Sequence, residues 1–253
     1  MDLYQQMVAG SGYMFLTFIV HEISWLGTNL FYLTLDHNNW LQQYRVTPSR
    51  VPVSRQWQVF WQLALTHILL LLPLQLVAGP ILLSFLTPKA GLSLTSLGQF
   101  IIFNLIEDTV FYWVHRLMHR PWFFKHIHAQ HHHFDAAYGH TFSLNGEYAH
   151  WVENLFNDLL PLLAGPWFCH FWNPVPLELF WCWIIFRQLR SADAHSGYDF
   201  LRYERVWQPV RLLRSCYQGS AGHLHHHTLT GRKHNFGSYT FWDRWMGTLV
   251  KTT

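Results

Sequence analysis

The chain has 253 residues, enough for one large domain. Half of them are hydrophobic and only 12% are charged, whereas about a quarter are charged in a typical soluble domain, so an ordinary cytosolic globule is excluded. A formal charge of +3, without a basic run interleaved with aromatic residues, also excludes nucleic acid as a partner. Aromatic residues make up 18% of the chain, which favours a membrane protein, and the count of 19 histidines is unusual.

The first apolar segment runs from Gly12 to Leu33. Its length of about 20 residues is that of a transmembrane helix. His21 and Glu22 interrupt it, and we expect them to face another helix or a cavity. The N-terminus lacks a basic region followed by a cleavage site, so we expect this segment to stay in the mature protein.

Three further segments are predicted to cross the membrane, at about 57–86, 97–114 and 155–190. The first is the most apolar, and Pro73 and Pro80 should kink or break it. The second belongs to a helix from Leu97 to His119, which Pro121 ends. The third reads as a hairpin. The predicted fold is therefore all-α, a single domain over 1–253 with a multi-pass transmembrane bundle and a histidine-rich helical cap formed by 115–154 and 191–249.

Basic residues set the predicted orientation. Arginine and lysine residues lie at both ends of the hairpin formed by the segments 57–86 and 97–114, and the tip of this hairpin is poor in them. The positive-inside rule then places the cap in the cytosol. Cys169, Cys182 and Cys216 are odd in number and widely spaced, so they predict small buried side chains and no disulfide framework. A metal in this chain would be held by nitrogen and oxygen.

Eight histidines form three tight clusters. His115 and His119 are one helical turn apart, the spacing of a metal clamp, and the pattern H-x2-H-H occurs twice. The clustered residues are His115, His119, His128, His131, His132, His223, His226 and His227. Eight imidazoles exceed what one ion accepts and predict two ions, with iron, zinc, copper and nickel all suitable. The alternative is a surface patch that titrates with pH.

The other histidines carry less signal. His21, His37, His67, His140 and His170 are isolated, and we interpret them as satisfied core or interface residues. Spacing does not decide the role of His126, His133, His225 and His234, which lie beside the clusters. Asp108 shares a helical stripe with His115 and His119 and is a candidate to orient a metal-bound imidazole, while Glu107 points roughly 100° away and is a weaker one.

Several segments together resemble the fatty acid hydroxylase and sterol desaturase superfamily of membrane di-metal oxygenases, over about residues 40–249. They are Glu107 to Thr109, His115 to His119, Lys125 to His132, Glu147 to His150, His195 to Asp199, His223 to His227, and Trp242 to Thr248. The resemblance is closest to the 4-methylsterol monooxygenases. Trp151 and Leu224 depart from the common pattern, which usually has proline and aspartate there, so the pocket wall differs from that of the family.

The resemblance implies two iron ions, dioxygen as oxidant, and electrons from NAD(P)H through a cytochrome b5-type donor and its reductase. Zinc can occupy such sites after purification. It implies residence in the endoplasmic reticulum membrane, or in the inner membrane of a bacterium, with a cytosolic active site. It adds His150 and His195 as ligands or near neighbours. Asp193 and Asp199 flank His195 and either orient it or are ordinary helix-end or surface carboxylates.

The preferred function is a lipid monooxygenase acting on the C-4 methyl group of a 4-methylsterol. A sterol C-5 desaturase or another lipid or fatty acid hydroxylase would use the same ligands, because hydroxylation and desaturation both begin with hydrogen abstraction. An alternative of another class is a membrane protein that binds zinc and carries out no redox chemistry. The clusters lie at or beyond the ends of the predicted spans, which argues against a channel or carrier.

Overall fold

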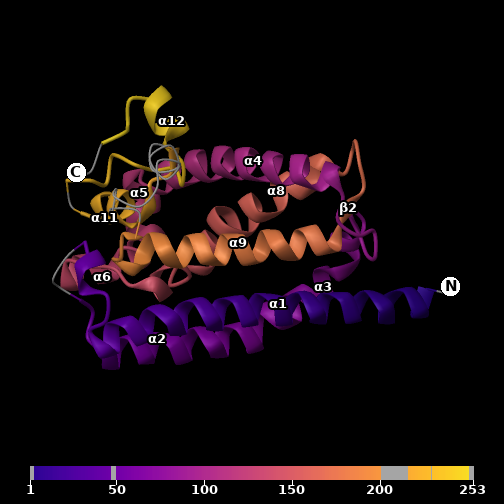
Figure 1. The fold of residues 1–253 in the computed structure, drawn as a ribbon, viewed down its shortest axis with the longest axis horizontal. Coiled ribbons are helices and arrows are strands. Elements are labelled where there is room, and N and C mark those ends of the chain that lie inside the picture. The colour runs from indigo at the N-terminus through magenta and orange to yellow at the C-terminus, as the bar shows by residue number, and fades with distance from the viewer. Residues whose placement is uncertain (1–2, 47–49, 201–215, 229, 251–253) are drawn as a thin grey trace.

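The structure is a computed structural model that describes residues 3–46, 50–200, 216–228 and 230–250. Nearly all secondary structure in this part of the chain is helical (Figure 1), which confirms the predicted helical class. Strands β1 (Leu86–Thr87) and β2 (Val175–Pro176) form a short parallel pair. Parts of the predicted polar loop and cap, at 47–49, 201–215 and 229, lie outside the described residues.

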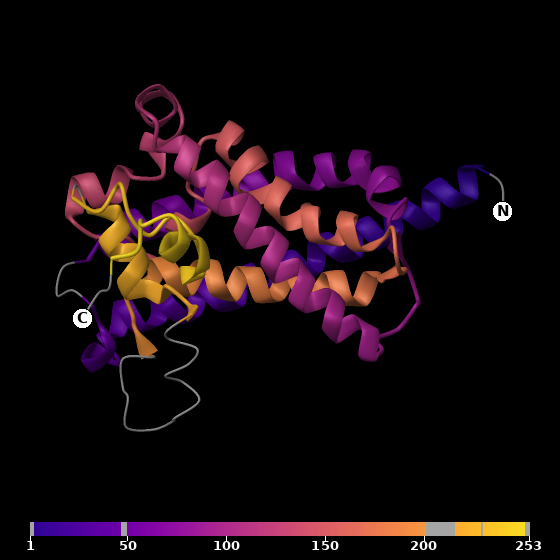
Figure 2. The ribbon, with the colours of Figure 1, turned by 90° about the horizontal axis from the view of Figure 1, so that it is seen from above.

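The longer helices make up most of the length of the molecule (Figure 1). They are α1 (Leu3–Asn38), α2 (Val53–Thr66), α3 (Leu72–Leu83), α4 (Leu94–Met118), α8 (Leu160–Cys169) and α9 (Leu177–Ser196). Helix α1 packs against α9 and α3, and α4 packs against α8. Figure 2 shows α4 crossing over α9 when the molecule is seen from above.

Two π-helical segments replace breaks that prolines would otherwise cause. Segment η2 (His67–Leu71) precedes Pro73 at the start of α3, and η5 (Asn154–Leu159) precedes Pro161 at the start of α8. Proline lacks an N–H and its ring clashes with the carbonyl four residues earlier, and in both cases that carbonyl lies in the π segment. The helix therefore continues past Pro73, and also through Pro80, instead of ending as a break would require.

Helices α2 and α3, with η2 between them, form one run of 31 residues, Val53–Leu83. Among the described residues, this is the one helical run that length and composition qualify to cross a membrane. At about 1.5 Å per residue it is roughly 46 Å long, more than the hydrocarbon thickness of a bilayer. Leu69, Val77 and Ile81 are 72%, 78% and 69% exposed, so much of its surface is apolar and uncovered by the rest of the chain.

Short helices gather at one end of the molecule, where α4 and α9 terminate (Figures 1 and 2). They are η1 (Gln42–Tyr44), α5 (Pro121–His126), η3 (His128–Gln130), α6 (His133–Tyr138), η4 (Ser143–Gly146), α7 (Trp151–Glu153), α11 (Gly219–His227) and α12 (Thr240–Trp245). Pro121 begins α5 and so separates it from α4. Gly197, with a φ of 76°, ends α9 in the left-handed conformation that glycine favours.

The core between α4, α8 and α9 depends on one close approach. Phe103 of α4 is fully buried, and Gly165 of α8 lies directly against its backbone. Cys169 is buried in the same core, but Cys182 and Cys216 are exposed. The prediction of buried cysteines is therefore wrong for two of them, because an apolar segment does not reveal which of its faces the rest of the chain covers.

We expect Gly165→Ala to destabilise the fold. A Cβ atom at Gly165 would lie 2.7 Å from the Cα atom of Phe103, and a helix backbone cannot move as a flexible side chain does, so the free energy of unfolding should fall by about 1–3 kcal/mol. Denaturant unfolding in detergent measures this. Gly98→Ala in α4 is the matched control, because its Cβ meets nothing within 4 Å. Equal losses in both variants would contradict the role of this contact.

Candidate metal centre

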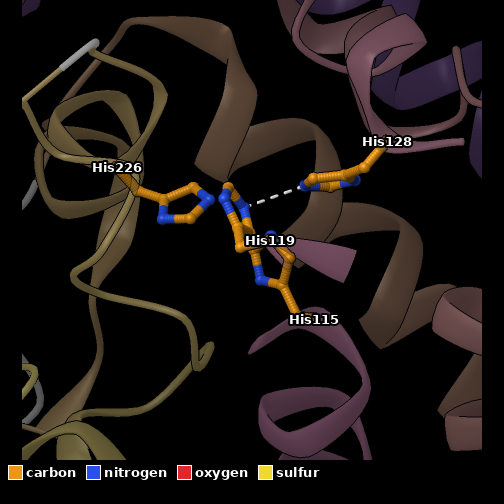
Figure 3. A group of neighbouring side chains, drawn as sticks. All are labelled: His115, His119, His128 and His226. Carbon is orange, nitrogen blue, oxygen red and sulfur yellow. Dashed lines mark hydrogen bonds between the residues drawn. The ribbon is translucent and has the colours of Figure 1, made fainter. Parts of the chain in front are cut away.

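The last turn of α4 presents the first pair of imidazoles. His115 and His119 lie one turn apart, and their ring centroids are 5.1 Å apart. His128 comes from η3, and its Nε2 atom is 3.0 Å from Nε2 of His119. His226 of α11 completes the group, with its ring centroid 4.6 Å from that of His115. Figure 3 shows these four rings pointing toward one another.

We call this group site 1 (His115, His119, His128 and His226). One ring nitrogen from each residue can be chosen so that all four lie within 4.8 Å of one another. Site 2 consists of His131, His195, His223 and His227, and it satisfies the same criterion. The C-terminal cluster is therefore in direct contact with the clusters near the end of α4, as the sequence analysis expects.

The two sites adjoin. The rings of His128 and His131 are stacked with centroids 5.3 Å apart, and those of His223 and His226 are 5.6 Å apart. Each H-x2-H-H cluster contributes to both sites, because its histidines three apart face neighbouring positions, whereas His223 and His227, four apart, face the same one. The structure thus brings two four-histidine groups side by side.

His195 joins site 2 from the last turn of α9. Its Nε2 atom is 2.8 Å from Nε2 of His223 and 3.3 Å from Nε2 of His131. The spacing of histidines in the sequence gives no hint of this, and only the family resemblance adds His195 to the candidates. His132 differs from His195, because the sequence spacing predicts it as a ligand but it belongs to neither four-histidine group. It lies between the two sites, with its Nε2 atom 3.2 Å from Nε2 of His128.

The remaining candidates lie elsewhere. His150 caps the first turn of α7 by accepting a hydrogen bond from the backbone N–H of Val152 at 3.3 Å, and the structure does not place it in either site. His126 and His133 are exposed. His140 is buried beside Arg45, in agreement with its interpretation as a core residue.

The Nδ1 atoms of six of these rings have oxygen acceptors, which determine the tautomer of each, whereas Nδ1 of His131 is buried without a partner. Backbone carbonyls accept from His115 (Phe236 O, 2.7 Å), His195 (Ser191 O, 2.8 Å) and His226 (His234 O, 2.6 Å). A neutral imidazole that donates from Nδ1 has its lone pair on Nε2. Each of these rings therefore presents an unprotonated Nε2 atom, which is the form that binds metal.

Carboxylates do the same for three other rings. Glu153 lies 2.7 Å from Nδ1 of His128, and the two oxygens of Asp135 lie 3.2 Å and 3.3 Å from Nδ1 of His132 and His227. With both Nδ1 protons donated to carboxylates, the Nε2 atoms of His128 and His132 face each other with two lone pairs. Such a contact is repulsive unless a cation lies nearby.

Two further observations fit a metal centre. The Nε2 atoms of His115 and His226 are buried and have no hydrogen-bond partner, which is costly for a polar atom unless it binds an ion. The Nε2 to Nε2 distances of 2.8–3.3 Å in these clusters are close to the roughly 2.9–3.4 Å that separates neighbouring ligands at metal–nitrogen distances of about 2.0–2.1 Å. The residues present therefore fit bound transition-metal ions.

Burial also keeps these rings neutral. It lowers the pKa of His115 and of His128 to about 3, and that of His195 to about 4. A protonated imidazole cannot bind metal, so low pKa values keep the lone pairs available at pH 7. No cysteine belongs to either site, so nitrogen donors define the choice among iron, zinc, copper and nickel.

Asp108 does not orient a metal-bound imidazole, in contrast to the expectation. Its carboxylate accepts hydrogen bonds from the backbone N–H groups of Ser238 and Tyr239 at 2.9 Å and 3.0 Å. Asp243 accepts from the N–H groups of Phe236 and Gly237 in the same loop. The two carboxylates fix this loop, and the loop supplies the Phe236 carbonyl to His115. Asp108 thus affects the His115 ring indirectly, by fixing the loop whose carbonyl accepts the hydrogen bond from that ring.

The other predicted carboxylates also bind elsewhere. Glu107 pairs with Arg187 and Arg190 of α9. Asp193 accepts hydrogen bonds from the hydroxyl groups of Tyr32 and Tyr217 at 2.9 Å and 3.2 Å. Asp199 is buried, and its backbone N–H donates to the carbonyl of Tyr44.

Sequence reasoning missed the two carboxylates that do contact the rings, Asp135 and Glu153. Asp135 follows His132 by three residues, so a helical spacing pointed to it. No spacing in the sequence pointed to Glu153, because it lies 25 residues from His128 along the chain.

Comparison with known proteins shows which family the chain belongs to. The fatty acid hydroxylase family matches residues 100–248, which contain every histidine of both sites. The chain belongs to the fatty acid hydroxylase family. No solved structure matches it.

Curated relatives of this fatty acid hydroxylase family member include methylsterol monooxygenase 1-1 of Arabidopsis thaliana, which is 33% identical over 81% of this chain and 66% of its own length. The C-4 methylsterol oxidase of Schizosaccharomyces pombe is 28% identical over 93% and 76%. The very-long-chain aldehyde decarbonylase GL1-11 of rice, Oryza sativa, is 30% identical over 91% and 82%.

A small cavity of about 70 Å³ reaches both sites of this family member. Its lining includes His115 of site 1 and His131, His195 and His223 of site 2, together with polar side chains such as Asp158 and Arg187. About 10–15 Å³ of such volume holds one water molecule. The cavity therefore has room for a few small molecules and none for a lipid.

We expect Glu153→Gln to weaken metal binding at site 1. The amide keeps an acceptor for Nδ1 of His128 but removes the negative charge 2.7 Å from that ring, and loss of such an outer partner typically lowers metal affinity about 10- to 100-fold. Competition between the protein and a chelator for Zn²⁺ measures this. Glu178→Gln, at the opposite end of α9 from His195, is the control and should bind as the wild type does. Equal affinities in the two variants would refute the role of Glu153.

Proposed function

We propose that the chain is a membrane monooxygenase that oxidises the C-4 methyl group of a 4-methylsterol at a pair of iron ions. The observation that carries this proposal is the pair of adjoining four-histidine sites. Two of the relatives are named for methylsterol oxidation.

We assign as metal ligands His115, His119, His128 and His226 at one ion and His131, His195, His223 and His227 at the other. His132 adjoins both. Iron fits the proposed reaction better than zinc, because zinc cannot change its oxidation state. Bound iron supplies the activation of dioxygen. The overall reaction consumes the methyl compound, O₂, NAD(P)H and a proton, and it yields the alcohol, water and NAD(P)⁺.

The chain itself provides three things for this chemistry. The Nδ1 hydrogen bonds orient five of the eight proposed ligands before an ion binds, namely His115, His128, His195, His226 and His227. Burial of both sites excludes bulk water, which protects a reactive centre from side reactions. The small cavity beside the sites accommodates dioxygen and water, so the lipid must enter by movement of the surrounding side chains.

A multi-pass membrane arrangement completes the proposal. Besides the run at Val53–Leu83, apolar side chains stand exposed along α4, where Leu97, Ile101 and Leu105 are 64%, 54% and 64% exposed. Contiguous apolar surface of this kind is costly in water and normal in lipid. The helices at 12–33, 57–86, 97–114 and 155–190 would then cross the bilayer, so the histidine sites lie just outside it.

Arg116, Arg120 and Lys125 lie at the histidine end. The positive-inside rule assigns this end to the cytosol, and we place the protein in the endoplasmic reticulum membrane, or in the inner membrane if the source is bacterial. A cytosolic site is accessible to a cytochrome b5-type donor and its NAD(P)H-dependent reductase, which would deliver the two electrons.

We expect His119→Ala and His227→Ala to abolish turnover. Each removes a nitrogen from a different site, and loss of a ligand should exceed the roughly 10- to 100-fold cost of losing an outer partner. The assay incubates purified protein with a 4-methylsterol, NADPH and a reconstituted donor, and mass spectrometry detects a product heavier by one oxygen atom. His37→Ala, which alters an exposed histidine of α1, is the control and should retain activity.

Other outcomes of this assay would overturn the assignment. A product lighter by two hydrogens would identify a desaturase. Turnover of a long-chain aldehyde without turnover of the sterol would favour the activity for which the rice relative is named. Full occupancy by zinc after iron-replete preparation, together with no consumption of O₂, would favour a protein without redox chemistry.

A further inference from the structure

A third group of metal-binding side chains lies apart from sites 1 and 2. His21 and Glu22 stand on α1, and His67 is the first residue of the π segment η2. One ligand atom from each of the three residues can be chosen so that all lie within 4.8 Å of one another. The side chain of His67 is 6% exposed, and those of His21 and Glu22 are 16% exposed.

Both rings turn the same nitrogen toward one carboxylate. The Oε1 atom of Glu22 lies 2.9 Å from Nδ1 of His21 and 3.0 Å from Nδ1 of His67. Two imidazole nitrogens and one carboxylate oxygen that converge in this way form the 2-His-1-carboxylate set of mononuclear metal sites. The remaining coordination positions of such a site are normally taken by water or by a small ligand.

The opposite edges of both rings face a second carboxylate. Glu147 lies 2.9 Å from Nε2 of His67 and 3.7 Å from Nε2 of His21. The side-chain amide of Gln188 is 2.7 Å from Nε2 of His21 and also donates to Glu147 at 2.7 Å. Metal-bound histidines usually have a carboxylate on the ring nitrogen that does not bind the ion, and Glu147 occupies that place for His67, while the amide nitrogen of Gln188 lies at Nε2 of His21.

The charges of the cluster point the same way. Glu22 and Glu147 bring two negative charges into a largely buried place, and in the described part of the chain their ion-pair partners are the two histidines alone. The balance requires either protonation of both imidazoles or one divalent cation. A cation on the Glu22 side satisfies both Nδ1 atoms and leaves the Nε2–H group of His67 to donate to Glu147.

We propose that His21, Glu22 and His67 bind a third metal ion, a single divalent transition ion of the zinc or iron class, with Glu147 orienting the imidazole of His67. The ion joins α1 to η2, two elements distant in sequence. Glu147 follows Gly146, where a Cβ atom would lie 3.3 Å from Nδ1 of His195. The third site therefore adjoins the segment that packs against site 2.

Metal content tests this directly. Wild-type protein in detergent is stripped with a chelator, reloaded with Zn²⁺ alone and dialysed, and zinc per chain is measured by mass spectrometry. We expect three equivalents in the wild type and two in Glu22→Gln and in His67→Gln. The variant His37→Gln alters a histidine on the same helix as His21, outside the cluster, and should retain three.

Two conservative variants in different elements guard against a folding failure, and circular dichroism verifies that each keeps the helical content of the wild type. Two equivalents in the wild type and an unchanged count in both variants would show that protonated imidazoles balance the carboxylates and would overturn the proposal. The variant His119→Ala separates this result from the function proposed above. It should lose zinc from site 1 and still lose one more equivalent when Glu22→Gln is added.

Discussion

The structure depends on a conflict between imidazole lone pairs. Hydrogen bonds from Nδ1 to fixed oxygen acceptors leave the Nε2 atoms of rings such as His115, His128 and His226 unprotonated, and the fold then buries them facing one another. Neutral rings cannot satisfy each other in this arrangement, and burial keeps them from taking up protons. A bound cation removes the repulsion between the lone pairs, so metal binding and the packing of the cap are energetically coupled.

The rest of the fold brings these rings to one place. Helices α4 and α9 end at the same end of the molecule (Figure 1), which brings His115 and His119 near His195. Helix α11 inserts its histidines between them, and the loop fixed by Asp108 and Asp243 supplies a carbonyl acceptor. The long apolar helices thus act as a rigid frame, and the chemistry is confined to their last turns and to short segments.

The sequence predicted the helical class and the convergence of the histidine clusters, because spacings of three and four residues have a direct meaning on a helix. It did not predict the role of Asp108, since a helical stripe does not reveal which segment packs on it. Pro73 suggested a kink or a break, and the helix continues past it because a π segment precedes it, which single-residue propensities do not encode. Glu153 had no local signal because its contact with His128 is between segments.

The alternation of the two H-x2-H-H clusters between the sites has a consequence for assembly. His128 and His131 belong to different sites but share one short segment, and so do His226 and His227. An ion that enters one site fixes the backbone that carries ligands for the other. Occupancy of the two positions is then thermodynamically linked and reciprocal, so an ion bound at one position raises the affinity of the other position for its own ion.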